Sequence, residues 1–133
     1  MPPLPPADLG APGWSVRQGQ AVWISARGKE GIAGEILLAT RASGECFVQF
    51  AKPPFTLATA RAEAGVWSVA LASARRQFSG RDRGPVRFVW FALAEEVRGC
   101  RAGGGWSFEA RNGTKWCLTN AFTGEVLEGY FGP

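Results

Sequence analysis

A chain of 133 residues, 46 % hydrophobic and 20 % charged, is long enough to form one domain around its own core. Its net charge of +4 favours anionic surfaces as partners without identifying one. Histidine is absent, which excludes Ser-His-Asp and Cys-His nucleophiles, His-ligated zinc and the side chain that most often transfers protons near neutral pH. Six Trp and nine Phe are an unusually large number of bulky aromatic residues for a chain of this length.

Residues 1–13 are rich in proline and are predicted to be a flexible lead-in to a single β-rich domain at 14–133. They lack the basic start and the apolar core of a signal peptide. Such a lead-in fits a mature protein whose export signal has been removed, and it equally fits a cytosolic protein that begins here. Because no run of about 18 apolar residues occurs, no segment is expected to span a membrane.

Alternating apolar residues separated by turn residues predict a series of short strands through the first part of the chain. Gly34 marks a bend in the longest of them. Pro53 and Pro54 cannot donate to a ladder and therefore separate two strands. The predicted strands are 20–26, 32–40, 46–51, 55–62, 66–71 and 77–79.

The stretch 85–98 predicts a helix, the one helical element of the chain. Pro85 suits the first turn, and Gly99 can take the left-handed conformation that ends a helix. The residues that recur at spacings of three and four, and so share its apolar face, are Val86, Val89, Trp90, Leu93 and Val97. We expect this face to pack on a sheet.

The C-terminal part predicts three more strands, the first two joined in a hairpin at Asn112-Gly113. A two-residue loop would pair Phe108 with Cys117 and put the apolar sets on opposite faces. A three-residue loop with Gly113 left-handed would instead pair Phe108 with Trp116, and the shared apolar face favours this second register. The last strand is predicted at 125–131.

These elements predict a mainly β fold. Its core would be a strongly curved antiparallel sheet, a half-barrel of about nine strands, with one covering helix laid on the concave face. The competing architecture is a small closed barrel with the helix capping one end, which would leave no unpaired edge strand.

Three cysteines, Cys46, Cys100 and Cys117, form no C-x-x-C pair, so neither zinc binding nor redox work is indicated. We expect buried or half-buried free thiols, and one disulfide stays open for a protein outside the cytoplasm.

A basic run contains Arg75, Arg76, Arg81, Arg83 and Arg87. Guanidinium groups match phosphate geometry, so these residues could contact nucleic acid or an anionic membrane surface. A solvated linker is the alternative. Nucleic-acid binding is disfavoured because most of the aromatic residues lie on apolar stripes.

No arrangement of residues indicates catalysis or a cofactor. Glu95 and Glu96 are neighbours on the predicted helix and point in different directions, and Glu125 and Glu128 face opposite sides of a strand. We therefore expect a protein that is not an enzyme, with no bound metal and no cofactor.

The order of six strands, one helix and three strands is similar to that of the bacterial lipoprotein localisation factors, the periplasmic carrier and its outer-membrane receptor. The segment 34–55, GEILLATRASGECFVQFAKPPF, resembles the paired strands and the following proline turn of that family. The resemblance implies an unclosed β-barrel whose apolar concave face and helical lid hold lipid acyl chains. It also implies a periplasmic or outer-membrane-associated protein, with a cytoplasmic location as the alternative.

We therefore predict non-enzymatic binding of a lipophilic ligand, either a small molecule with an acyl chain or the lipid moiety of a lipidated protein. The basic run would then meet lipid phosphates at a membrane surface. The alternatives are a structural or protein-interaction domain, and nucleic-acid binding through the basic run. The residues predicted to line the apolar cleft are Trp23, Ile36, Leu38, Phe50, Leu57, Trp67, Val69 and Trp90.

Overall fold

The computed structural model describes residues 4–72, 76–111 and 114–132. They form one antiparallel sheet of nine strands and a single short helix, in the predicted order of six strands, helix and three strands. The elements are β1 (Ser15–Ile24), β2 (Ile32–Thr40), β3 (Cys46–Lys52), β4 (Phe55–Glu63), β5 (Val66–Leu71), β6 (Arg76–Arg81), α1 (Val89–Val97), β7 (Trp106–Arg111), β8 (Lys115–Asn120) and β9 (Val126–Phe131).

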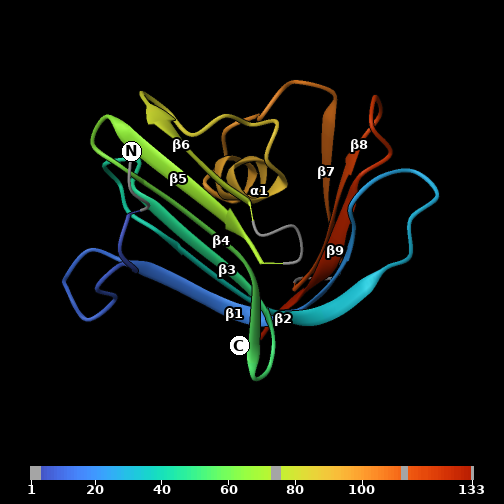
Figure 1. The fold of residues 1–133 in the computed structure, drawn as a ribbon, viewed down its shortest axis with the longest axis horizontal. Coiled ribbons are helices and arrows are strands. Elements are labelled where there is room, and N and C mark those ends of the chain that lie inside the picture. The colour runs from blue at the N-terminus through green and yellow to red at the C-terminus, as the bar shows by residue number, and fades with distance from the viewer. Residues whose placement is uncertain (1–3, 73–75, 112–113, 133) are drawn as a thin grey trace.

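The sheet is open, with the strand order β6-β5-β4-β3-β2-β1-β9-β8-β7. It is bent into a trough, and α1 lies inside it (Figure 1). We call β3 to β6 the long wall and β7 to β9 the short wall; β1 and β2 form the base between them. Within the described residues β6 and β7 are unpaired edges, so the predicted half-barrel is confirmed and the closed barrel is wrong.

The base meets the short wall where β1 pairs with β9. A Cβ atom at Gly129 would lie 2.0 Å from the carbonyl oxygen of Gln20, and one at Gly19 would lie 1.8 Å from that of Tyr130. Neither distance is sterically possible, so the two backbones approach this closely only because both positions are glycine. These two glycines permit the joint between base and short wall.

The helix is shorter than the predicted 85–98, because it begins at Val89. Phe88 has extended backbone angles (φ −82°, ψ 122°) and precedes the first helical residue. Its ring packs against Phe78 of β6 and Trp67 of β5, with centroid distances of 5.2 and 5.7 Å. This packing on the long wall outweighs the local preference for continuing the helix back to Pro85.

The predicted end of the helix is confirmed. Gly99 has φ +90°, its N–H donates to the carbonyl of Glu96 at 3.0 Å, and the N–H of Cys100 donates to that of Glu95 at 2.9 Å. This pair of hydrogen bonds is a Schellman motif, which satisfies carbonyl groups that a helix end leaves without partners.

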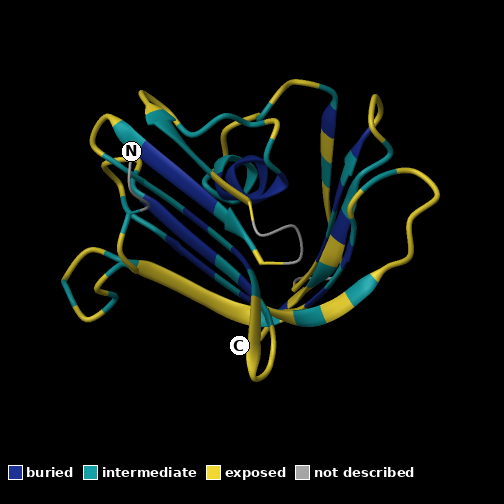
Figure 2. Cartoon of the chain, viewed as in Figure 1, coloured by how far each residue is buried: buried dark blue, intermediate teal, exposed yellow. Residues whose placement is uncertain are grey.

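The core lies between α1 and the concave face. Trp90 packs against Trp23 of β1 and Phe50 of β3, with ring centroids 5.1 and 5.4 Å away. Ala58 and Ala60 on β4 are also buried, and their small side chains leave room for the helix. Residues 89–94 are all buried, and the concave surface in Figure 2 is correspondingly buried along the long wall. The predicted contact of the helix with the concave face is confirmed.

The hairpin of β7 and β8 has a register that neither proposed loop gives. Phe108 lies opposite Leu118, and Ala110 lies opposite Trp116. The apolar residues share one face, as the favoured register requires, but the pairing is displaced by two residues from the predicted partner Trp116. A two-residue displacement moves no side chain to the other face, so the apolar pattern does not distinguish the two registers. The predicted conformation of Gly113 lies outside the described residues.

The described part of the proline-rich lead-in lies along the outer, convex face of the long wall. The N–H of Leu4 donates to Ser68 Oγ at 3.1 Å, and Arg61 donates to the carbonyl of Pro5. Ser68 and Phe47 lie in this row of the outer face and are buried, which the overlying segment explains. The flexibility of the lead-in stays a prediction.

Glu125 lies just before β9, where Trp23 Nε1 donates a hydrogen bond to its carboxylate at 2.8 Å. Burial raises the pKa of the Glu125 carboxyl to about 7, and the hydrogen bond from Trp23 opposes this shift only in part. The folded protein therefore holds a proton on Glu125 at pH values where the unfolded chain has released it.

The glycine joint gives a stability prediction. Gly129→Ala should lower the free energy of unfolding by about 2 kcal/mol, because its methyl group overlaps the backbone of β1. Gly132→Ala is the matched control, since a Cβ there meets nothing nearer than the Gln18 carbonyl at 3.5 Å. Urea denaturation of both variants measures the difference. Equal stabilities would show that the joint does not need a bare backbone at Gly129.

The second prediction concerns pH. The free energy of unfolding should fall as the pH rises from 4.5 to about 7, because the folded state there binds more protons than the unfolded state. Glu125→Gln should remove this part of the pH dependence, whereas Glu30→Gln, at an exposed position, should retain it. Denaturation at about pH 5 and about pH 8 tests this. An unchanged pH profile in Glu125→Gln would contradict it.

Candidate functional site

The residues predicted to line an apolar cleft belong to the packed core in this structure. Seven of the eight are buried in one cluster with α1, and Leu57 packs partly buried against that cluster. Trp90, itself on the helix, contacts Trp23 and Phe50 directly. The helix thus occupies the space along the long wall that a ligand would need, and a candidate site has to be sought elsewhere on the concave face.

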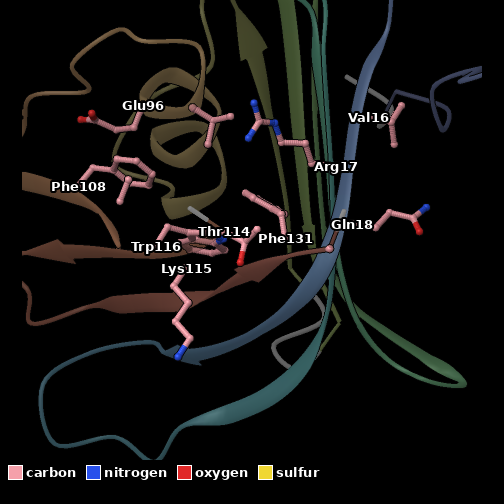
Figure 3. A pocket seen from close by; sticks show the side chains of 12 residues that line it. Val16, Arg17, Gln18, Glu96, Phe108, Thr114, Lys115, Trp116 and Phe131 are labelled. Carbon is pink, nitrogen blue, oxygen red and sulfur yellow. The ribbon is translucent and has the colours of Figure 1, made fainter. Parts of the chain in front are cut away.

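Such a site lies between the helix and the short wall. A pocket of about 650 Å³ opens at the end of the trough where α1 and β9 end and β1 begins. We call it the mouth pocket (Figure 3). Its lining residues are Val16, Arg17, Gln18, Glu96, Val97, Phe108, Ala110, Thr114, Lys115, Trp116, Phe131 and Gly132.

Aromatic rings form the floor of the mouth pocket. Trp116 of β8 and Phe131 of β9 are stacked, with centroids 5.2 Å apart and an interplanar angle of 26°. Both come from the concave face, because Trp116 alternates with Lys115 and Phe131 with Tyr130, whose side chains are exposed. Phe108 and Val97 add apolar surface. Trp116 and Phe131 are themselves buried, so the half-buried Val97 and Phe108 supply much of the apolar surface that a chain can reach.

The charged residues of the mouth pocket are unequally placed. Arg17 points from β1 toward the helix and into the pocket, and its guanidinium carbon lies 6.0 Å from the centre of the Phe131 ring. Among the described residues no carboxylate forms an ion pair with Arg17. The Lys115 side chain points away from the pocket, as do Val16 and Gln18 (Figure 3).

Glu96, the acidic residue of the lining, has a partner already. Its carboxylate accepts the backbone N–H of Ala102 at 2.9 Å and points away from Arg17. Arg17 is therefore the ionic group that faces the pocket.

A second unsatisfied group lies in the floor. The indole nitrogen Nε1 of Trp116 is buried and has no acceptor among the described residues. Trp106, by contrast, donates its Nε1–H to the carbonyl of Val86 at 2.6 Å and ties the short wall to the segment before α1. A buried N–H without an acceptor costs about 1–3 kcal/mol.

A second pocket, of about 770 Å³, lies on the other side of the end of α1, against the long wall. Its charges are largely paired within the protein: Arg98 and Arg83 contact Glu95 at 2.9 and 3.4 Å, and Arg41 contacts Glu45 at 2.9 Å. The hydrogen bond from Arg41 lowers the pKa of Glu45. This pocket therefore offers a ligand less uncompensated charge than the mouth pocket does.

The basic run is not gathered into one surface. Arg76 and Arg81 are exposed at opposite ends of β6. Arg83 pairs with Glu95, and Arg87 lies over the Phe88 ring at 4.6 Å. Arg75 lies outside the described residues.

The thiols are free, as expected, but only two of them are buried or half-buried. Burial raises the pKa of Cys46 to about 11 and also raises that of Cys117, where Glu128 adds to the effect. Cys100 is exposed, contrary to the expectation. Raised pKa values oppose thiolate formation, which a cysteine nucleophile requires. Within the described residues no group of acidic and cysteine side chains could hold a metal ion.

Sequence reasoning missed the mouth pocket for identifiable reasons. The first strand was predicted to begin at residue 20, whereas β1 begins at Ser15, so Arg17 fell outside every predicted element. The register predicted for the hairpin placed Trp116 opposite Phe108, whereas it lies opposite Ala110. The usable signal was the two-residue period of β1. Arg17 is separated by an even number of residues from Ala21 and Trp23, which places it on the concave face with them.

The described part of the chain contains no helix with the length and apolar character needed to cross a membrane. Comparison with models of known protein families finds no match, and no curated protein matches the chain in sequence.

Proposed function

We propose that this protein binds a lipophilic ligand, an acyl chain or a similar apolar chain, in the mouth pocket. The observation that carries the proposal is the open pocket between α1 and the short wall, whose floor contains the stacked and largely buried rings of Trp116 and Phe131. Its ligand site differs from the cleft predicted from the sequence, which is occupied by the helix.

The size of the pocket supports this function. Ligand pockets in proteins have volumes of roughly 300–1,000 Å³ and are lined mainly by apolar and aromatic side chains, with few polar groups. The mouth pocket, at about 650 Å³, lies within this range. Each CH₂ group buried there would contribute about 0.8 kcal/mol, so affinity should rise with chain length until the pocket is filled.

The relationship to the lipoprotein localisation factors stays a prediction. The open half-barrel with a helix on its concave face is the fold that the resemblance implied. A lipidated protein as the partner, and a periplasmic or outer-membrane location, are proposals that depend on that relationship.

Nucleic-acid binding has less support. It would need exposed aromatic residues among the arginines. The large exposed aromatic residues of the described chain lie away from β6: Phe55 begins β4, Phe122 lies in the β8–β9 turn and Tyr130 lies on β9. A protein-interaction role has one favourable observation, the two unpaired edges β6 and β7 in the described sheet, which could pair with a strand of another chain.

Binding can be tested with N-phenyl-1-naphthylamine, an uncharged dye that fluoresces in apolar surroundings, and with dodecanol as a competitor. We expect the dye to bind and dodecanol to displace it. Ala110→Trp should fill the pocket and abolish dye binding, because Ala110 is an exposed lining residue whose substitution leaves the core intact.

Ala33→Trp is the matched control, since Ala33 is equally exposed on β2 but alternates with the residues of the concave face. It should bind the dye as the unmodified protein does. No dye binding, or equal loss in both variants, would overturn the proposed function. A strand-pairing role would instead appear as self-association that is insensitive to Ala110→Trp.

A further inference from the structure

We infer that the ligand of the mouth pocket carries an anionic head group, a carboxylate or a phosphate monoester, which binds Arg17 while its apolar chain lies over Trp116 and Phe131. This inference rests on the proposed function and adds the chemical class of the ligand to it.

The position of Arg17 carries the inference. Its charged side chain points into the pocket, whereas those of Glu96 and Lys115 point away from it (Figure 3). The guanidinium is held beside the Phe131 ring and has no carboxylate partner among the described residues. Guanidinium groups bind carboxylates and phosphates through two parallel hydrogen bonds, which are about twice as strong as bonds between neutral groups.

The two pockets beside the end of α1 show that pairing is the usual state of arginines in this part of the molecule. On the long-wall side Arg41, Arg83 and Arg98 each contact a glutamate. On the short-wall side Glu96 is held by Ala102 and points away from Arg17. The Glu96 carboxylate is thus directed away from an anion bound at Arg17, and an anionic head would give Arg17 the partner that these other arginines already have.

An uncharged ligand fits the pocket less well. Covering the guanidinium with an apolar chain removes water from a charge and supplies no replacement, which is unfavourable. An anion relieves that cost. The buried Nε1–H of Trp116 is a second donor without an acceptor. It is covered in this structure, so a ligand oxygen reaches it only if neighbouring side chains turn.

The geometry also orders the ligand within the pocket. Arg17 lies near the start of β1, in the base of the trough, whereas Phe108 lies on β7, the edge strand of the short wall. An amphiphile with its head at Arg17 would place its chain over the aromatic floor. A free anion without a chain would gain little from this pocket, because the floor consists of aromatic rings and the Nε1–H of Trp116 is covered.

The test compares amphiphiles of equal chain length by displacement of N-phenyl-1-naphthylamine. Dodecanoate and dodecyl phosphate should bind at least about tenfold more tightly than dodecanol and dodecyltrimethylammonium, since one charge-assisted contact is worth about a factor of ten or more. Inorganic phosphate and acetate should not displace the dye, which separates an amphiphile from a free anion. The preference should weaken in high salt.

Three variants locate the preference. Arg17→Gln should lower the affinity for dodecanoate about tenfold and leave that for dodecanol unchanged, and Arg17→Lys should keep most of the preference. Arg101→Gln makes the same change in net charge at an exposed arginine outside the pocket, and it should have no effect.

Two results would overturn the inference. Equal affinities for dodecanoate and dodecanol would show that the ligand needs no anionic head group. The proposed binding of a lipophile would still stand. Equal losses in Arg17→Gln and Arg101→Gln would show that net charge, not Arg17, attracts the anion. If neither dodecanoate nor dodecanol binds, the proposed function falls together with the inference.

Discussion

The packing of Trp90 between Trp23 and Phe50 is the contact on which the rest of this structure depends. A single helix of nine residues is too short to be stable alone, so it holds its place through the rings that it presents to the sheet. Those rings fill the concave face along the long wall. The half-barrel consequently has a packed core on one side of the helix. On the other side lies a pocket lined in part by Trp116 and Phe131, which are themselves buried. We therefore place the proposed ligand site beside the helix, toward the short wall.

Two pockets flank the end of α1, and their charged residues are paired to different extents. Against the long wall, arginines and glutamates neutralise one another at hydrogen-bond distances. Against the short wall, Arg17 faces aromatic rings, and no carboxylate among the described residues forms an ion pair with it. Arg17 is exposed, so water solvates its guanidinium in place of a carboxylate, and an anion can replace that water. This difference in pairing is the reason why we propose the mouth pocket, and not its neighbour, as the binding site.

The sequence predicted the architecture well because each feature had a local cause. Two-residue alternation set the strands, the spacing from Val89 to Val97 set the helix face, and Gly99 set its end. The errors arose where tertiary contacts decided. Phe88 packs on Phe78 and Trp67 and lies outside the helix. The β7–β8 register differs from the predicted one by two residues, a displacement that leaves the apolar pattern of each face unchanged.

The candidate site could not be read from the sequence for a related reason. An apolar stripe gives the face of a strand but not whether a helix or a ligand covers it. The aromatic residues Trp23 and Phe50 are therefore indistinguishable in pattern from Trp116 and Phe131, although the first pair is covered by α1 and the second lines a pocket. Arg17 was hidden because it lies in the polar first half of β1, where the strand extends beyond its apolar part.

The most direct test of this account is a crystal structure of the protein with a bromine-labelled dodecanoate, in which anomalous scattering locates the bromine. The account predicts bromine density over the Trp116 and Phe131 rings, between α1 and the short wall, with Trp90 still packed on Phe50. Bromine between α1 and the long wall, with the helix displaced from Trp23 and Phe50, would contradict it.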